Sequence, residues 1–167
     1  MSKLTTIQDI QLSMAEGSPI GKVDEPAVRR LWWAALETLQ EDILASVDLS
    51  GGLWLAAPLP ALYETNLLEK MQGWVWAPDQ LENLFSPHAG LLPPSRIRTI
   101  HEKSFTASGG YTRLPLRKED GHDPLLIIIT QELQVALTLF GQKGERSLLV
   151  RSDPKSFSKL LKLLDSR

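Results

Sequence analysis

The chain has 167 residues with a formal net charge of -2, and 23% of its residues are charged. This length suits one domain with a single core, and so small a net charge leaves no electrostatic footprint for nucleic acid or for an anionic membrane surface. The absence of cysteine excludes disulfides, thiolate metal sites and cysteine nucleophiles, and it fits a reducing cytoplasm.

Residues 1–22 are predicted to form an N-terminal tail that ends in a cluster of glycine, serine and proline at 17–21. The tail has no apolar core of signal-peptide length, and no stretch of the chain reaches membrane-spanning length, so we expect a soluble, cytoplasmic protein. Two alternatives remain open for the tail: it is mobile, or it forms a short helix or strand on the body. The residues that favour the second are Ile7, Ile10, Leu12 and Met14.

A single domain is predicted from residue 23 to residue 167, and it opens with a helix over 24–48. Asp24 is a suitable N-cap, and Pro26 in the first turn needs no amide partner there. Helical spacing then predicts a broad face that packs on the core. That face consists of Val28, Leu31, Trp32, Ala35, Leu36, Leu39, Ile43 and Val47.

Two large apolar residues of this helix, Trp33 and Leu44, fall on the opposite side in the helical projection. They are either solitary exposed side chains, which are common, or a contact with another protein or a second copy of the chain. A solvated tryptophan is unusual, which is the reason for considering the second interpretation.

The middle of the chain is expected to alternate between short strands and helices, with prolines and glycines between them. In chain order, the expected elements are a strand over 53–57, a helix over 61–71, a strand over 74–76, helical turns over 78–85, a proline-rich loop over 86–95, and strands over 96–105 and 111–116.

Trp54, Trp74 and Trp76 lie on two of these strands. If the strands pair, the three rings are candidates to line a pocket for a flat or apolar ligand. The alternative is plain core packing, which is commoner for aromatic residues on half-buried strands.

Arg96 and Arg98 would share one face of the expected strand over 96–105. They are either a solvated face or a contact for an anion or an acidic partner. Nucleic acid is not expected, because a single-strand site needs aromatic residues interleaved with the basic ones. No two histidines or carboxylates stand at ligand spacing on a helix, so neither a metal nor any other cofactor is predicted.

The last third of the chain predicts an antiparallel meander closed by a helix. Residues 125–129 form an unbroken apolar run typical of a strand buried on both faces, and 133–140 alternate with a period of two. A polar turn over 142–145 separates them from an apolar strand over 148–150. Asp153 and Pro154 then mark the start of a helix over 154–164.

The order of these elements resembles that of GAF-type sensory domains. The residues 123–126 (DPLL), Gln131-Glu132 and 152–154 (SDP) resemble the C-terminal part of DICT-type and GAF-like modules in cyanobacterial signalling kinases. The resemblance implies an α+β fold with a central antiparallel sheet of about five or six strands, on which N- and C-terminal helices pack. It implies signal input rather than catalysis, and without cysteine no tetrapyrrole can be anchored.

The sequence therefore predicts a non-catalytic regulatory, sensory or protein-interaction domain in signal transduction. Its partner would bind through helix 24–48. A small-ligand sensor with the three tryptophans around its pocket, or an accessory protein for an anionic partner, is the alternative. An enzyme that uses His101 and Glu102 is a third interpretation, and no nucleophile elbow or phosphate loop supports it.

Overall fold

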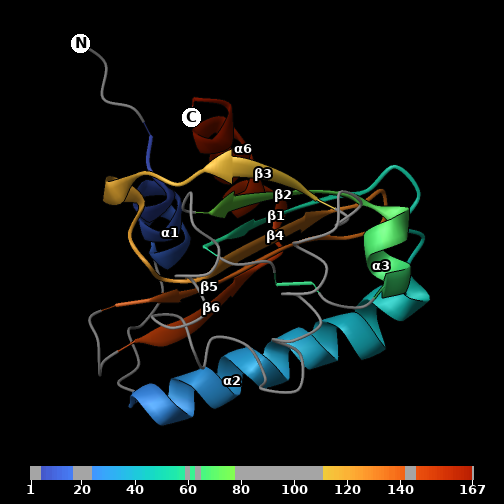
Figure 1. Ribbon diagram of the computed structural model, residues 1–167, viewed down its shortest axis with the longest axis horizontal. Helices are drawn as coiled ribbons and strands as arrows, with labels where there is room; N and C mark the ends of the chain where they lie inside the picture. Colours follow the sequence, from blue (N-terminus) through green and yellow to red (C-terminus); the bar gives the residue numbers. More distant parts are fainter. Residues whose placement is uncertain are drawn as a thin grey trace.

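A six-stranded mixed sheet forms the centre of the computed structural model (Figure 1). Its strands are β1 (Leu53–Ala57), β2 (Gln72–Ala77), β3 (Thr112–Pro115), β4 (Leu125–Ile129), β5 (Gln134–Phe140) and β6 (Ser147–Arg151). Their order across the sheet is β3-β2-β1-β4-β5-β6. From β1 through β4 and β5 to β6 each pair is antiparallel, whereas β1 with β2 and β2 with β3 are parallel.

The structure describes residues 5–16, 24–58, 61–62, 65–77, 111–141 and 146–166. The helical turns expected over 78–85, the loop over 86–95, the strand over 96–105 and the turn over 142–145 lie outside the described residues. Within those residues the helices are α1 (Ile7–Ala15), α2 (Glu25–Thr38), α3 (Thr65–Lys70) and α6 (Pro154–Asp165).

The predicted α+β class is confirmed, with six strands and helices from both ends of the chain packed on the sheet. The C-terminal meander has the predicted antiparallel pairing, and α6 begins at Pro154 with Asp153 accepting a hydrogen bond from the Ser156 amide at 2.9 Å. The sheet is mixed rather than wholly antiparallel. The reason lies between β1 and β2, where α3 forms a crossover that lets the second strand run parallel to the first.

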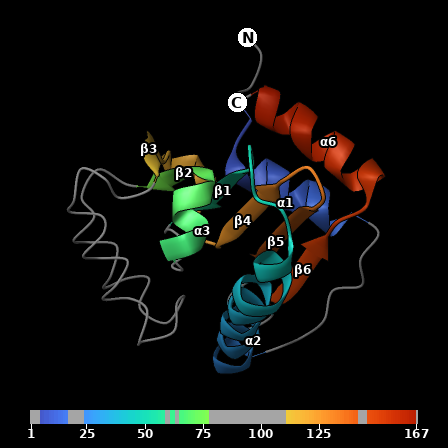
Figure 2. The same ribbon diagram turned by 90° about the vertical axis from the view of Figure 1, so that its right-hand side faces the viewer.

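Helices cover both faces of the sheet, with α1 and α6 on one side and α2 on the other (Figure 2). β4 contributes to both cores, because alternate side chains of a strand point to opposite faces. Leu126 and Ile128 pack towards α2, and Leu125 and Ile127 pack towards α1 and α6. The prediction that this strand is buried on both faces is confirmed, since these four residues are 0% exposed.

Of the two alternatives for the N-terminal segment, the structure has the second, because residues 7–15 form helix α1 and belong to the core. Asp120 accepts a hydrogen bond from the Ile7 amide at 2.9 Å, and Arg151 donates to the Met14 carbonyl at 2.9 Å. Between these ends, the buried Gln11 side chain donates to the Asp123 carbonyl and to Thr138 Oγ1, both at 2.9 Å. The helix is therefore held at its start, its middle and its end by residues that lie more than a hundred positions along the chain.

Candidate functional site

The three tryptophans considered for a pocket do not share a face of the sheet. Trp54 is paired with Gly73, and Trp74 is paired with Leu55, on the parallel strands β1 and β2. Paired residues point the same way and neighbours in a strand point opposite ways, so Trp54 faces α2 whereas Trp74 and Trp76 face the side of α1 and α6. Trp54 and Trp76 belong to different cores accordingly. A pocket lined by all three is therefore not formed.

Trp54 is fully buried, and its indole lies against the backbone of Gly73 and edge-on to the Tyr111 ring, with centroids 6.0 Å apart. Its Nε1 has no hydrogen-bond acceptor among the described residues. Trp54 therefore serves as core packing between β1 and β2, which was the alternative interpretation of these aromatic residues.

The predicted exposure of Trp33 and Leu44 is also wrong. Leu44 is 1% exposed and Trp33 is half-buried against the core below α2. Conversely, Leu31 and Ile43, which were placed on the core face, are 46% and 40% exposed. For Ile43 and Leu44 the cause is a π-helical turn over Leu39–Ile43, which continues α2 and precedes a 3-10 turn over Leu44–Ser46.

The π turn changes which residues face the sheet. Its i→i+5 bonding inserts one residue into the helical repeat and sets the following residues back by about 100°. Apart from Leu39, which is also buried, five buried positions then recur at a constant spacing of four along the whole segment. They are Val28, Trp32, Leu36, Gln40 and Leu44.

The same shift brings exposed residues into one line. In a straight α-helix, two side chains twelve residues apart differ in direction by about 120° around the helix axis. The residue inserted by the π turn reduces this difference to about 20°. Trp32 and Leu44, twelve apart, both face the core, so Leu31 and Ile43, also twelve apart, both face outwards. We call the resulting surface the outer strip. It consists of Arg30, Leu31, Ala34, Thr38, Asp42 and Ile43, all exposed.

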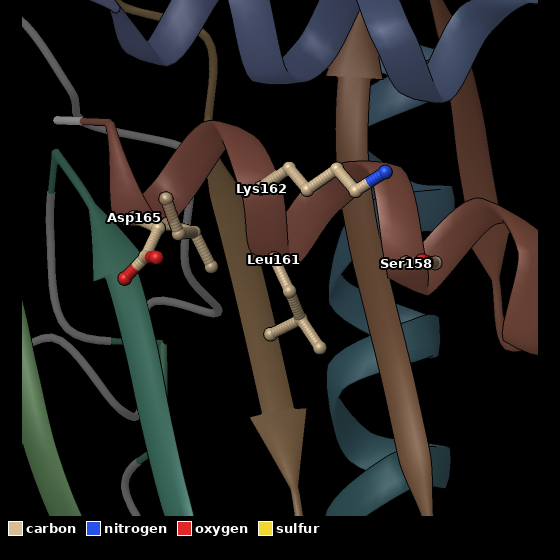
Figure 3. A pocket seen from close by; sticks show the side chains of 5 residues that line it. Ser158, Leu161, Lys162 and Asp165 are labelled. Atoms are coloured by element: carbon tan, nitrogen blue, oxygen red, sulfur yellow. The ribbon is translucent and has the colours of Figure 1, made fainter.

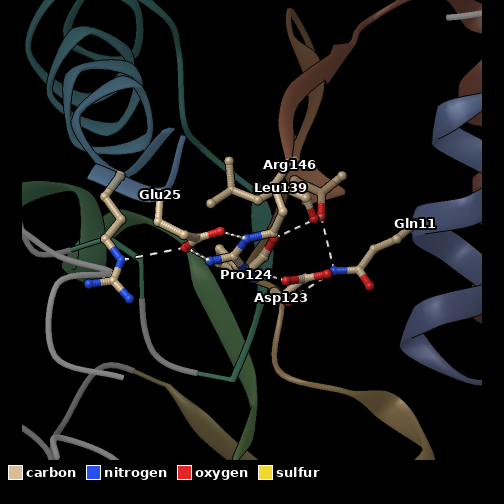
Figure 4. Close-up of polar contacts among 8 residues, drawn as sticks. Gln11, Glu25, Asp123, Pro124, Leu139 and Arg146 are labelled. Atoms are coloured by element: carbon tan, nitrogen blue, oxygen red, sulfur yellow. Dashed lines mark hydrogen bonds and ion pairs between the residues drawn. The ribbon is translucent and has the colours of Figure 1, made fainter. Parts of the chain in front are cut away.

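A polar cluster, the Arg146 cluster, joins the start of α2 to the strands (Figure 4). Arg146 Nε donates to Glu25 Oε1 at 2.8 Å, Nη2 donates to Glu25 Oε2, and Nη1 donates to Asp123 Oδ1. The three side chains are 11%, 16% and 29% exposed for Arg146, Glu25 and Asp123. Such a bidentate guanidinium–carboxylate pair fixes orientation as well as charge.

The electrostatics of the cluster follow from its partial burial. Burial, the largest cause, raises the pKa of Asp123, the hydrogen bond and charge of Arg146 lower it, the charge of Glu25 raises it again, and the net shift is upward. The hydrogen bonds that Arg146 donates to Glu25 raise the pKa of Arg146 and keep the guanidinium charged. Both carboxylates already accept hydrogen bonds from one cation, an arrangement that suits a structural tie between α2, β4 and β6 rather than proton transfer.

An open depression lies on the outer side of α6, with a volume of about 530 Å³ (Figure 3). All of the described residues that line it come from that one helix: Ser158, Leu161, Lys162, Leu164 and Asp165. Ligand sites are concave and collect polar groups from several elements, so this depression lacks the walls of a binding pocket.

The predicted basic contact cannot be placed, because Arg96 and Arg98 lie outside the described residues, as do His101 and Glu102. Within the described ranges, no three His, Cys, Asp or Glu side chains are grouped so as to hold a metal ion. None of the described helices combines the length and apolar character that crossing a lipid bilayer requires.

Sequence reasoning missed the outer strip and the Arg146 cluster. The strip had one visible signal, the exact four-residue recurrence of apolar positions from Val28 to Leu44, interrupted only by Gln40. The cluster had none, because Glu25 and Arg146 are 121 positions apart.

Comparison with known proteins places the chain in a family. No curated protein and no solved structure matches it. The model of a family described as a domain of unknown function, DUF8628, matches residues 8–167, which include α1, except its first residue, and every described element that follows it. The match covers far more than half of the sequence, and the chain belongs to the DUF8628 family.

Proposed function

We propose that this domain is a non-catalytic regulatory or protein-interaction module, and that the outer strip of α2 is its contact surface. The observation that carries the proposal is the pair Leu31 and Ile43, two large apolar side chains that are 46% and 40% exposed on one side of the helix. Exposed apolar side chains that gather on one face and are edged by charges are typical of protein contacts.

The way α2 is held supports this role. Its core side buries Val28, Trp32 and Leu36, and the Arg146 cluster fixes its first turn to the strands. A helix fixed in this way presents its outer side as a rigid surface, so little conformational entropy is lost when a partner binds. The resemblance to GAF-like modules of signalling proteins, together with a chain free of cysteine, supports a role in cytoplasmic signal input.

The proposal is tested with Leu31→Asp and a matched control, Leu12→Asp, which places the same change on α1 at a residue that is 59% exposed. The wild type and both variants are used as bait in extract of the native cell, and each complex is sized by light scattering. We expect Leu31→Asp to lose the complex and Leu12→Asp to keep it. Equal behaviour of all three proteins would contradict the proposal.

A further inference from the structure

We infer that the occupant of the outer strip is a second copy of the same chain, with the two α2 helices packed antiparallel about a two-fold axis. This inference rests on the proposed function and names the partner. It depends on the order of charged, apolar and small residues along the strip, which is self-complementary when the strip is reversed.

The pairing follows from a two-fold axis, which brings residue i of one copy to residue j of the other and j to i. Reversal about one centre pairs Arg30 with Asp42, Leu31 with Ile43, and Ala34 with Thr38. All three pairs are centred at positions 36 to 37, so a single axis satisfies them together. The result is an ion pair and an apolar contact side by side towards each end, and small side chains at the middle.

The small residues fall where close approach is needed. Helices pack with their axes about 8 to 10 Å apart, and the nearest approach is at the crossing point. Ala34 and Thr38, both exposed, lie on either side of the axis and leave the two backbones room to come together. Leu31 and Ile43 then fill the space on each side, where the helices diverge.

The placement of Asp42 is a second, independent observation. It lies with Glu41 in the last turns of the α2 segment, at the negative end of the helix dipole, where a carboxylate is disfavoured. Asp42 and Arg30 are both exposed, twelve residues apart along the segment. An antiparallel copy offsets the unfavourable position of Asp42, because Asp42 then meets the cation of Arg30 and the two helix dipoles run against each other.

Cysteine cross-linking tests the arrangement directly, since the natural chain has no cysteine. The variants Leu31→Cys and Ile43→Cys are purified separately. Each variant alone, and a mixture of the two, is then oxidised under mild conditions. Positions 31 and 43 are about 18 Å apart along one helix. In the antiparallel pair, each single variant therefore holds its two thiols too far apart for a disulfide, whereas the mixture brings position 31 to position 43 within bonding range.

We expect a disulfide-linked dimer in the mixture and monomers from each variant alone. Dimers from a single variant would indicate parallel packing and overturn the inference. Absence of any cross-link, with the mass of a monomer for the wild type, would also overturn it. A partner protein captured in a Leu31-dependent manner would in that case leave the proposed function standing, so the two failures are distinguishable.

Charge exchange gives a second test that does not depend on oxidation. Arg30→Asp or Asp42→Arg alone breaks both symmetric ion pairs, so we expect each to weaken self-association about fivefold. The double exchange Arg30→Asp/Asp42→Arg restores opposite charges in the antiparallel arrangement, and we expect self-association to recover. Failure of the double variant to recover, while the circular dichroism spectrum stays native, would contradict the antiparallel pairing.

Discussion

The indole of Trp54 lies so close to the backbone of Gly73 that a Cβ atom at position 73 would be 2.1 Å from its Cε2 atom. Side-by-side pairing of the two residues in β1 and β2 explains the contact. Only glycine leaves space for the ring there, and the ring in turn fills the core between the sheet and α2. The packing of β1 on β2 therefore depends on the absence of a side chain at position 73.

Gly73→Ala is expected to lower the free energy of unfolding by about 2 kcal/mol or more, because the buried ring must leave its position. Urea unfolding measures the loss, and near-ultraviolet circular dichroism reports the displaced tryptophan. The control is Gly51→Ala, where φ is +71° and nothing lies within 4 Å of the added Cβ, so only backbone strain of about 1 kcal/mol is expected. An equal loss in the two variants would contradict the packing described for Trp54.

Arg146→Met is expected to lower the free energy of unfolding by about 2 to 4 kcal/mol, because it leaves the partly buried Glu25 and Asp123 without their cation. Denaturant titration at neutral pH measures the effect. Lys159→Met is the control. Its ion pair with Glu16 is more than half exposed on both sides and is worth less than about 1 kcal/mol. A loss in Arg146→Met no larger than that in the control would show that the cluster is not a structural tie.

The raised pKa of Asp123 predicts a pH dependence with a definite sign. The folded state holds the proton of Asp123 more tightly than the unfolded state, in which the pKa of this carboxyl is near 3.8. The wild type therefore loses stability relative to Asp123→Asn as the pH rises from about 3.8 through the raised pKa of the folded state. Above that pKa, the difference in the free energy of unfolding between the two proteins is constant. Unfolding of both proteins between pH 3 and pH 7 measures this difference. A wild type that instead gains on the variant over that window would show that the pKa of Asp123 is lowered.

Asp120 is 1% exposed and accepts hydrogen bonds from the amides of Ile7 and Arg117, at 2.9 and 2.7 Å. Asp120→Ala leaves both amides without this acceptor, and we expect a loss of about 2 to 3 kcal/mol. Hydrogen exchange followed by mass spectrometry should show faster exchange in α1, with the meander unchanged. In the control, Asp153→Ala, the exposed cap of α6 is removed, and faster exchange should be confined to α6. Unchanged exchange in α1 of Asp120→Ala would contradict the docking described here.

Local patterns were sufficient to predict the meander and the starts of α2 and α6. The apolar run of β4, the alternation of β5 and the caps Asp24 and Asp153 are each contained within a few residues. The faces of the tryptophans were beyond such patterns, because the register of β1 on β2 decides which of them share a side. The place of α1 depends on Asp120, Thr138 and Arg151, which are distant in sequence.

The outer strip was missed for a different reason. A helical projection assumes the same rotation per residue throughout, and the π turn at Leu39–Ile43 breaks that assumption. The projection therefore exchanged the inner and outer sides of the second half of the helix. Leu44 was placed outside and Ile43 inside, whereas the structure has them the other way round.

Sedimentation equilibrium over a range of concentrations tests most directly whether the outer strip is a self-complementary contact. For a chain of 18.6 kDa, we expect the wild-type mass to rise towards twice this value with concentration, and the mass of Leu31→Asp to stay at that of the monomer. A wild type that remains a monomer throughout, or a Leu31→Asp variant that associates as the wild type does, would contradict the account.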